Sequence, residues 1–240
     1  MQLKDKKIFI TGASRGIGRD LALSLASEGA ELILTARNED LLRDVQREID
    51  AKKGKQPLII TADLSKEEDI SNLFKEVRKH YSDLDVLINN AAMGLYGRLE
   101  DFAMKDLDKI YKVNVRALYM CCQQALKMMI PSRSGHIINI SSVVGFKGYP
   151  NMSAYTASKH AVTGISKSLA AEVQEYGINV SIISPGGVDT EFATQARPDL
   201  DTSILIPPSD ISKTVIYLLT LSNRSMVDEI YIRRSTGKPF

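Results

Sequence analysis

Short apolar runs without polar alternation recur along the chain, and after each of them apolar residues return every three or four positions. An unbroken apolar run indicates a strand buried on both faces, as in a parallel sheet, whereas the wider spacing is typical of an amphipathic helix. The expected strands are residues 7–11, 31–36, 57–61, 85–89, 136–141, 179–184 and 229–232. No linker rich in Pro, Gly or Ser interrupts the alternation, so it predicts one α/β domain over residues 1–240, with a parallel sheet and helices on both faces.

Several helical segments carry signals of their own. Ser65 and Glu68 form the Ser-x-x-Glu pattern of a capping box, which predicts the start of a helix that runs to about Tyr81. A long helix is expected over residues 104–130, and it contains Asn114, a residue type that within a helix usually faces solvent or is hydrogen-bonded in the core. Between residues 190 and 207 the pattern lapses directly after a strand, which indicates a short lid over a site at that strand end.

A glycine-rich turn, T-G-A-S-R-G-I-G at residues 11–18, joins the first strand to a helix. Strand, glycine turn and helix is the context in which such a motif binds a dinucleotide, because glycine lets the backbone approach the pyrophosphate and the helix start offers free amides. The glycines fall at 12, 16 and 18, which departs from the general G-x-G-x-x-G spacing. A tight turn without a ligand is the alternative.

The end of the second expected strand bears on cofactor choice. An acidic residue about twenty positions after the glycines takes the ribose 2′-hydroxyl of NAD, whereas an arginine there accommodates the 2′-phosphate of NADP. This chain has Ala36 followed by Arg37, and Arg15 in the glycine turn is a candidate second cation. The pattern favours NADP. In the alternative, Arg37 only leads into a solvated helix whose first turn carries Glu39 and Asp40.

Three polar side chains are expected to converge at the end of the fifth strand. Tyr155 and Lys159 are four residues apart, so they share one face of a helix. Ser142 directly follows the fifth expected strand, and open α/β sheets bind their ligands at the carboxyl ends of strands. A cation beside a phenol favours the phenolate and so lowers the pKa of the phenol. Lowering that pKa from about 10 towards 7 corresponds to roughly 4 kcal/mol of stabilisation of the phenolate, and such a tyrosine exchanges a proton at neutral pH. A pair of surface side chains is the alternative for Tyr155 and Lys159.

Composition narrows the classes of function. The chain has 31 Lys and Arg against 29 Asp and Glu, so no strong field indicates nucleic acid or an anionic membrane as a partner. No apolar run is long enough to span a bilayer and the start of the chain is charged, so a soluble, cytoplasmic protein is expected. Cys121 and Cys122 are adjacent, which indicates buried small residues rather than a disulfide. The three histidines share no ligand spacing, so no metal is expected.

The chain resembles the short-chain dehydrogenases/reductases over nearly its whole length. The order and spacing of several motifs carry the resemblance: T-G-A-S-R-G-I-G at 11–18, N-N-A-A at 89–92, Asn114, Ser142, Y-T-A-S-K at 155–159 and P-G-G-V-D-T at 185–190. The resemblance implies a Rossmann-type, doubly wound, seven-stranded parallel sheet. It also implies a homotetramer or homodimer that packs the helices around Asn114 and after Tyr155 against a partner.

In such an enzyme Tyr155 is the general acid and Lys159 lowers its pKa and holds the nicotinamide ribose. Ser142 positions the substrate oxygen, and Asn114 holds a water that connects Lys159 to solvent. The glycine-rich turn, the arginines that favour NADP and the family resemblance together predict the residues that bind the cofactor. They are Gly12, Ser14, Arg15, Gly16, Ile17, Gly18, Arg37, Asp63, Leu64, Asn90, Tyr155, Lys159, Pro185, Gly186, Val188 and Thr190. The implied cofactor is NADP(H).

Two positions depart from the pattern of many relatives. Ala92 stands where many have glycine, and the chain ends in E-I-Y-I-R-R-S-T-G-K-P-F where many end in a strand followed by V-x-x-G-G. The second departure leaves open the oligomer contacts that the C-terminus of the family makes.

The residues expected around the nicotinamide are mostly apolar, which favours an apolar ketone or aldehyde as substrate. They are Met93, Leu95, Tyr96, Val144, Phe146, Tyr149, Val188 and Phe192. The nearest likeness is to 3-oxoacyl-(acyl-carrier-protein) reductases, but at the two carrier-docking places only Arg133 is basic, so a free carbonyl compound is at least as well supported. The leading interpretation is an NADPH-dependent carbonyl reductase. The alternative is a catalytically silent NADP-binding sensor or scaffold.

Overall fold

Seven strands, all paired in parallel, form one sheet in the computed structural model, which describes residues 3–196, 201–222 and 224–237. The sheet order is β3-β2-β1-β4-β5-β6-β7. The strands are β1 (Lys7–Thr11), β2 (Glu31–Ala36), β3 (Leu58–Thr61), β4 (Val86–Asn89), β5 (Gly135–Ile140), β6 (Ile178–Pro185) and β7 (Glu229–Ile232). The predicted doubly wound fold is confirmed. The order reverses between β1 and β4, the point at which open α/β sheets bind ligands.

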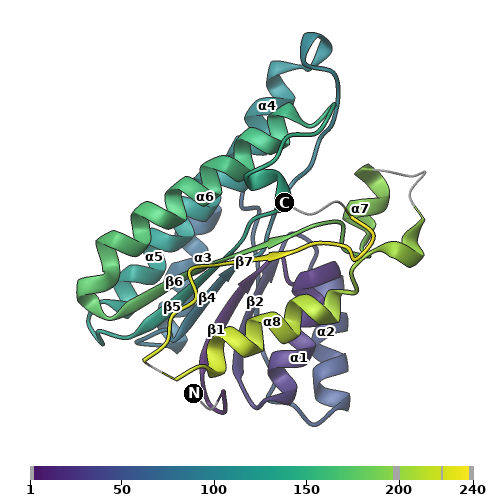
Figure 1. Cartoon of the computed structure of the whole chain (residues 1–240). Coiled ribbons are helices and arrows are strands. Elements are labelled where there is room, and N and C mark those ends of the chain that lie inside the picture. Colours follow the sequence, from purple (N-terminus) through teal and green to yellow (C-terminus); the bar gives the residue numbers. More distant parts are fainter. Residues whose placement is uncertain (1–2, 197–200, 223, 238–240) are drawn as a thin grey trace.

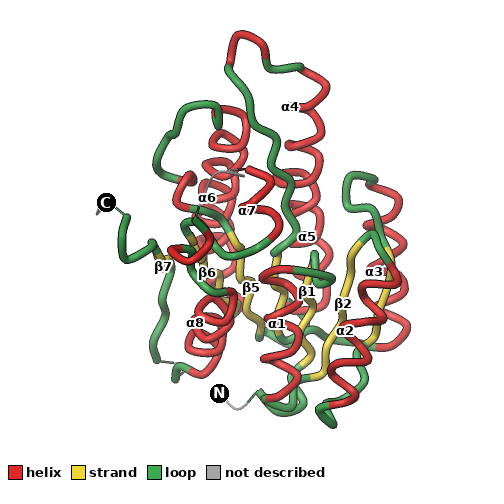
Figure 2. Tube along the Cα trace, turned by 90° about the vertical axis from the view of Figure 1, so that its right-hand side faces the viewer, coloured by secondary structure: helices red, strands yellow, loops and turns green. Residues whose placement is uncertain are grey.

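Helices cover both faces of the sheet (Figure 1). One face carries α1 (Gly16–Ser27), α2 (Glu39–Ala51) and α8 (Pro208–Thr220), and the other carries α3 (Glu67–His80), α5 (Leu118–Met129) and α6 (Ser153–Val173). Helix α4 (Met104–Tyr111) extends beyond the end of the sheet. A short helix, α7 (Glu191–Ala196), stands with the loops that follow the strands at one end of the sheet (Figure 2).

Two apolar cores hold these layers together, and β1 contributes to both. Successive side chains of a strand point to opposite faces, so Ile8 and Ile10 pack under α1 and α2 while Phe9 packs on Phe74 of α3 at a ring-centroid distance of 5.1 Å. All three β1 residues are fully buried, which explains why the strand reads as an unbroken apolar run.

Cys121 and Cys122 confirm the sequence interpretation of buried small residues, because both are buried and free in the core formed with α3 and α6. Burial raises the pKa of the Cys122 thiol to about 12, so it stays protonated at neutral pH.

The capping-box prediction at Ser65 is wrong. Helix α3 begins at Glu67 after Lys66, which makes no side-chain cap bond. Two aspartates take the amides of this turn instead, because Asp63 Oδ1 accepts from Ser65 N at 3.0 Å and Asp69 Oδ2 accepts from Asp63 N at 3.0 Å. The loop after β3 is thereby fixed by carboxylates rather than by the serine hydroxyl.

The buried His136 is expected to make the folded protein less stable in mild acid. It is buried in β5 with Nε2 2.9 Å from Ser181 Oγ, and burial lowers its pKa from 6.5 to about 4. As pH falls, this histidine is protonated near pH 6.5 in the unfolded chain but only near pH 4 in the folded chain. The free energy of unfolding therefore decreases as pH drops through that window, by about 3 kcal/mol in all. Urea unfolding of the wild type at pH 7 and at pH 4.5 measures this loss.

His136→Gln is the matched variant, because glutamine can still bond Ser181 but does not titrate. Its loss of unfolding free energy between the two pH values is expected to be smaller than that of the wild type by about 2–3 kcal/mol. The same loss in both proteins would mean that carboxylates alone cause the acid sensitivity.

Candidate active site

A cleft of about 1690 Å³ runs along the carboxyl ends of the strands, across the point where the strand order reverses. It contains nearly all the residues predicted from the sequence: Gly12, Ser14, Arg15, Gly16, Ile17, Arg37, Asp63, Leu64, Asn90, Ser142, Tyr155, Lys159, Pro185, Gly186, Val188 and Thr190. The loops that carry them are far apart in the chain and meet here because parallel strands end at the same edge. Gly18 and Asn114 do not line the cleft.

The glycine turn after β1 is packed closely against the loops that follow other strands. Gly12 and Gly16 have positive φ values of +66° and +54°, and a Cβ on Gly12 would stand 2.8 Å from Ala91 Cα. Gly18 lies behind the turn, where a Cβ would collide with the Gly12 carbonyl, so its role is packing. No side chain caps the start of α1, so its first amides remain available to an anion.

Thr11 and Asn90 hold this turn against the end of β4. Asn90 Nδ2 donates to the carbonyls of Thr11 and Gly12, both at 3.0 Å, while Thr11 Oγ1 accepts from the amides of Asn90 at 3.0 Å and Ala91 at 3.1 Å. The sequence predictions did not include Thr11. A threonine as the last residue of a buried apolar strand, directly before the glycines, was the available signal.

The far end of the cleft carries the predicted adenosine residues. Arg37 is exposed at the end of β2, and the described chain gives its guanidinium no hydrogen bond or ion pair. Burial opposes ionisation of Asp63, but hydrogen bonds from Ser65 and the nearby Arg37 charge leave its pKa below the usual range. Arg15 instead forms an ion pair with Glu191 of α7 at 2.8 Å. The two sides of the cleft are thus linked across the glycine turn.

Tyr155 stands in the first turn of α6 and is only 8% exposed. Its ring packs edge-on against Tyr96 and at a tilt against Phe192 of α7, each at a centroid distance of 5.8 Å. The side chain of Ser142 lines the same cleft and acts on this hydroxyl by lowering the pKa of the phenol. The oxygen predicted to exchange a proton therefore lies in the cleft, shielded from solvent and beside Ser142.

Burial and the adjacent Tyr96 raise the pKa of Tyr155, whereas hydrogen bonding with Ser142 lowers it, and the lowering expected from Lys159 stays a prediction. Lys159 Nζ lies 5.8 Å from the centre of the tyrosine ring and donates to the Ile140 carbonyl at 2.8 Å. Burial lowers its own pKa to about 8. The low dielectric disfavours both charged forms, so Tyr155 is a neutral phenol at neutral pH, the form that can donate a proton.

Asn114 does not line the cleft but connects two segments that do. It is buried within η2, a π-helical turn (Lys112–Ala117) that joins α4 to α5. Its Oδ1 accepts from Met93 N at 2.7 Å, and its Nδ2 donates to Met93 O at 2.9 Å and to Ser158 Oγ at 3.0 Å. Asn114 therefore ties the loop after β4 to α6, one residue before Lys159. Its role in holding a water stays a prediction.

The other end of the cleft is mostly apolar. Six of the eight predicted apolar residues line it: Met93, Tyr96, Val144, Tyr149, Val188 and Phe192. Leu95 and Phe146 do not line the cleft. Phe146 packs on Tyr231 of β7 at 4.3 Å instead. The predictions missed Met152 and the tail residues Arg233, Arg234 and Gly237, which also line the cleft.

Two findings concern other kinds of site. Within the described residues, no group of three or more His, Cys, Asp and Glu side chains is placed to hold a metal ion. Of the helices that the structure describes, none combines the length and the apolar character needed to cross a bilayer.

Comparison with known proteins agrees with this geometry. A family model described as short chain dehydrogenase matches residues 6–201. An uncharacterized oxidoreductase from Staphylococcus aureus is 34% identical over 231 residues, 96% of this chain and 98% of the relative. A metagenomic short-chain oxidoreductase solved with NADP is 34% identical, with a TM-score of 0.86 over 99% of this chain and 100% of that one. A short chain dehydrogenase from Escherichia coli complexed with NADPH is also 34% identical, with a TM-score of 0.90 and coverage of 96% and 97%.

Three observations lead to one assignment: a glycine turn held at the sheet reversal, a buried Tyr155 in the same cleft as Ser142, and a family model that spans most of the sequence. The chain belongs to the short-chain dehydrogenases, a family of oxidoreductases.

Proposed function

We propose that the protein reduces a ketone or aldehyde with NADPH and that Tyr155 is its general acid. The observation that supports this most is the buried, neutral Tyr155, which lines the same cleft as Ser142 and the glycine turn. Loss of NADPH absorbance with a panel of ketones and aldehydes tests it. A protein that binds NADPH but turns over no carbonyl would be the silent sensor or scaffold instead.

Each polar side chain has a distinct part in this reaction. A bound NADPH would supply the hydride that reduces the carbonyl carbon. Tyr155 donates its proton to the carbonyl oxygen, so that the product is an alcohol, and Ser142 positions the same oxygen by a hydrogen bond. The Lys159 ammonium, held by the Ile140 carbonyl, stabilises the negative charge left on the tyrosine oxygen. Asn114 keeps the loop of Met93 and helix α6 in register for this arrangement.

The residues of the cleft fit a dinucleotide with a 2′-phosphate. Uncapped amides at the start of α1 suit the pyrophosphate, and Asp63 and Leu64 flank the adenine end. Arg37 is the cation directly after β2, and the last residue of that strand is Ala36 rather than an acidic residue. Two structural relatives were solved with NADP or NADPH, which supports the same choice.

Arg37→Ala is expected to weaken NADPH binding about 10- to 100-fold and to change NADH binding less than about 3-fold. The reason is that a charge-assisted hydrogen bond to the phosphate contributes about 1.5–3 kcal/mol, and NADH has no phosphate at that position. Fluorescence titration with both cofactors measures the ratio. Arg43→Ala is the control, because Arg43 lies on the same helix α2 but pairs with Glu39 and does not line the cleft. Equal weakening of both cofactors would contradict the assignment.

The substrate end supports a carbonyl compound with an apolar body, since aromatic and aliphatic side chains form most of its wall. Helix α7 carries Phe192 onto Tyr155, and we propose the segment 190–207 as a short lid over this end. Residues 197–200 of that segment lie outside the described residues.

A free substrate is favoured over a 3-oxoacyl group on a carrier protein. Arg133, the single basic residue at the expected docking places, is engaged within the chain: its guanidinium donates to the Glu175 carbonyl and lies 5.9 Å from the Tyr176 ring centre. It is therefore poorly placed to attract an acidic carrier.

A homodimer or homotetramer is proposed for the assembly. Large apolar side chains are exposed on the projecting helix α4 (Figure 1), in the segment before it and at the start of α5, namely Leu99, Met104, Tyr111 and Tyr119. On α6, a Cβ at Gly164 would meet nothing within 4 Å, so another helix can approach closely there. Sedimentation velocity tests the proposal, and a monomer at micromolar concentration would contradict it.

A further inference from the structure

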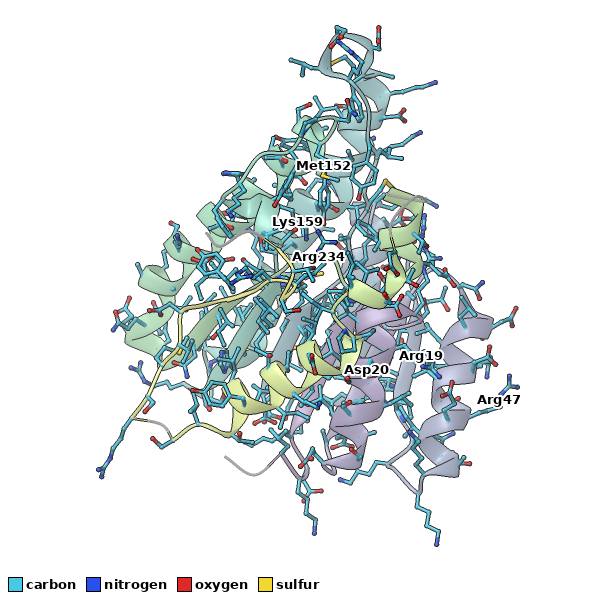
Figure 3. All side chains as sticks on the ribbon, turned by 45° about the vertical axis from the view of Figure 1, so that its right-hand side comes forward. Arg19, Asp20, Arg47, Met152, Lys159 and Arg234 are labelled. Carbon is cyan, nitrogen blue, oxygen red and sulfur yellow. The ribbon has the colours of Figure 1, made fainter. Side chains whose placement is uncertain are left out.

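The segment after β7 returns to the cleft and forms part of its wall. Gly186 N donates to Ile232 O at 2.7 Å, which continues the pairing of β6 with β7 and sets the next residues beside the loop that follows β6. A Cβ on Gly187 would lie 3.9 Å from Arg234 Cδ, so the stem of Arg234 runs along this loop. Figure 3 shows the labelled side chains of Met152, Lys159 and Arg234 in the same part of the molecule, and all three line the cleft.

The guanidinium of Arg234 has a buried nitrogen without a partner. Its Nη1 is covered by the protein and makes no hydrogen bond, while the half-buried side chain as a whole lines the cleft, and the described residues provide no ion pair to it. Leaving such a donor unpaired costs roughly 1–3 kcal/mol, and more for a charged group. The neighbouring arginine is used differently, because Arg233 Nη1 donates to the carbonyls of Arg234, Ser235 and Gly237 and so braces the tail. The bracing holds Arg234 in the wall of the cleft.

The charges around Arg234 select the sign of a ligand. Among the described residues, the acidic side chains that line the cleft are Glu39 and Asp63 at the adenosine end and Glu191, which is paired with Arg15. Cationic side chains line the substrate end, where Lys147 and Lys159 join the two tail arginines. A cleft with one sign of charge at its end concentrates ligands of the opposite sign.

We propose that Arg234 binds a carboxylate of the carbonyl substrate, so that the enzyme reduces an oxo acid rather than a neutral ketone. A carboxylate matches the planar fork of arginine, and one unpaired guanidinium suits a monoanion better than a doubly charged phosphate. The apolar side chains Tyr149, Met152 and Phe192 then accommodate the carbon chain of the acid. This inference deepens the proposed reductase function and rests on it.

Matched substrates test the proposal in the full-length enzyme with NADPH. Linear oxo acids that differ in the spacing of their keto and carboxylate carbons are compared with their methyl esters, which have the same carbonyl but no charge. For the best acid, kcat/KM is expected to exceed that of its ester about 10- to 100-fold. Arg234→Gln should remove most of this preference by lowering kcat/KM for the acid about 10- to 100-fold while changing that for the ester less than about 3-fold.

Two further variants separate charge, geometry and folding. Arg234→Lys keeps the charge but not the fork and should give an intermediate preference for the acid. Arg47→Gln is the control, because Arg47 is an exposed arginine of α2 that pairs with Asp44, outside this cleft (Figure 3). Thermal melting and NADPH titration check that the Arg234 variants fold and bind cofactor like the wild type.

Calorimetric titration of the same oxo acid into the NADP-saturated protein tests recognition without turnover. Binding to the wild type that Arg234→Gln weakens at least about 10-fold supports the inference even if no carbonyl is reduced, in which case the proposed function fails alone. Efficient reduction of neutral ketones, with acid and ester equal in the wild type and in Arg234→Gln, overturns the inference and leaves the reductase intact. A preference for keto phosphomonoesters over oxo acids also overturns it.

Discussion

Replacing Tyr155 with phenylalanine is expected to lower kcat for carbonyl reduction about 10³-fold or more, while NADPH affinity changes less than about 3-fold. Phenylalanine keeps the ring that packs against Tyr96 and Phe192, so the cleft retains its shape. It removes the hydroxyl that we propose as the proton donor, and general acid catalysis typically contributes 10²–10⁴-fold. Single-turnover kinetics with saturating NADPH measures the chemical step directly.

Tyr217→Phe is a suitable control for this experiment, since Tyr217 is exposed on α8 and does not line the cleft. A Tyr155→Phe enzyme with more than a tenth of the wild-type rate would show that another group donates the proton. Lys159 would then be the first candidate, because it lies beside the phenol and its pKa is about 8. A variant that no longer binds NADPH would give Tyr155 a structural role instead.

The layers of this fold could be predicted because burial leaves a periodic trace in the sequence. Ile8, Phe9 and Ile10 are apolar together since helices cover both faces of β1, and the glycine turn follows directly because the helix start must approach the strand. The same logic located the cleft, since parallel strands end at one edge.

Properties that depend on which groups meet in three dimensions could not be read from the sequence. The sequence places a lysine near Tyr155, but it does not show that the ammonium bonds the Ile140 carbonyl, nor that burial outweighs its effect on the phenol. A Ser-x-x-Glu pattern likewise does not show that Asp63 and Asp69 will take the amides first. The position of Arg234 depends on the pairing of β7 with β6, which the irregular tail sequence does not indicate.

Replacing Lys159 of helix α6 with methionine is expected to stabilise the protein and to lower turnover about 10²- to 10³-fold. Lys159 is 3% exposed, and its pKa falls from 10.5 in the unfolded chain to about 8 in the folded one, which corresponds to about 3 kcal/mol lost at pH 7 by holding the ammonium away from water. Methionine has a similar length and no charge. It leaves the Ile140 carbonyl without a donor, a cost of about 1–2 kcal/mol that offsets part of the gain.

The pH dependence identifies the cause of this stabilisation. Between about pH 8 and pH 10.5 the unfolded chain binds a proton that folded Lys159 releases, so wild-type stability rises with pH through this window because of Lys159, and the Met variant lacks that rise. Urea unfolding should therefore show an advantage of about 1–2 kcal/mol for the variant at pH 7, which shrinks towards pH 10. Lys75→Met, at an exposed position on α3, should show neither effect. A Lys159→Met protein that is less stable than the wild type at pH 7 would mean that the hydrogen bond to the Ile140 carbonyl outweighs the cost of burying the charge. The Lys159 ammonium would then stabilise the fold as well as take part in the reaction.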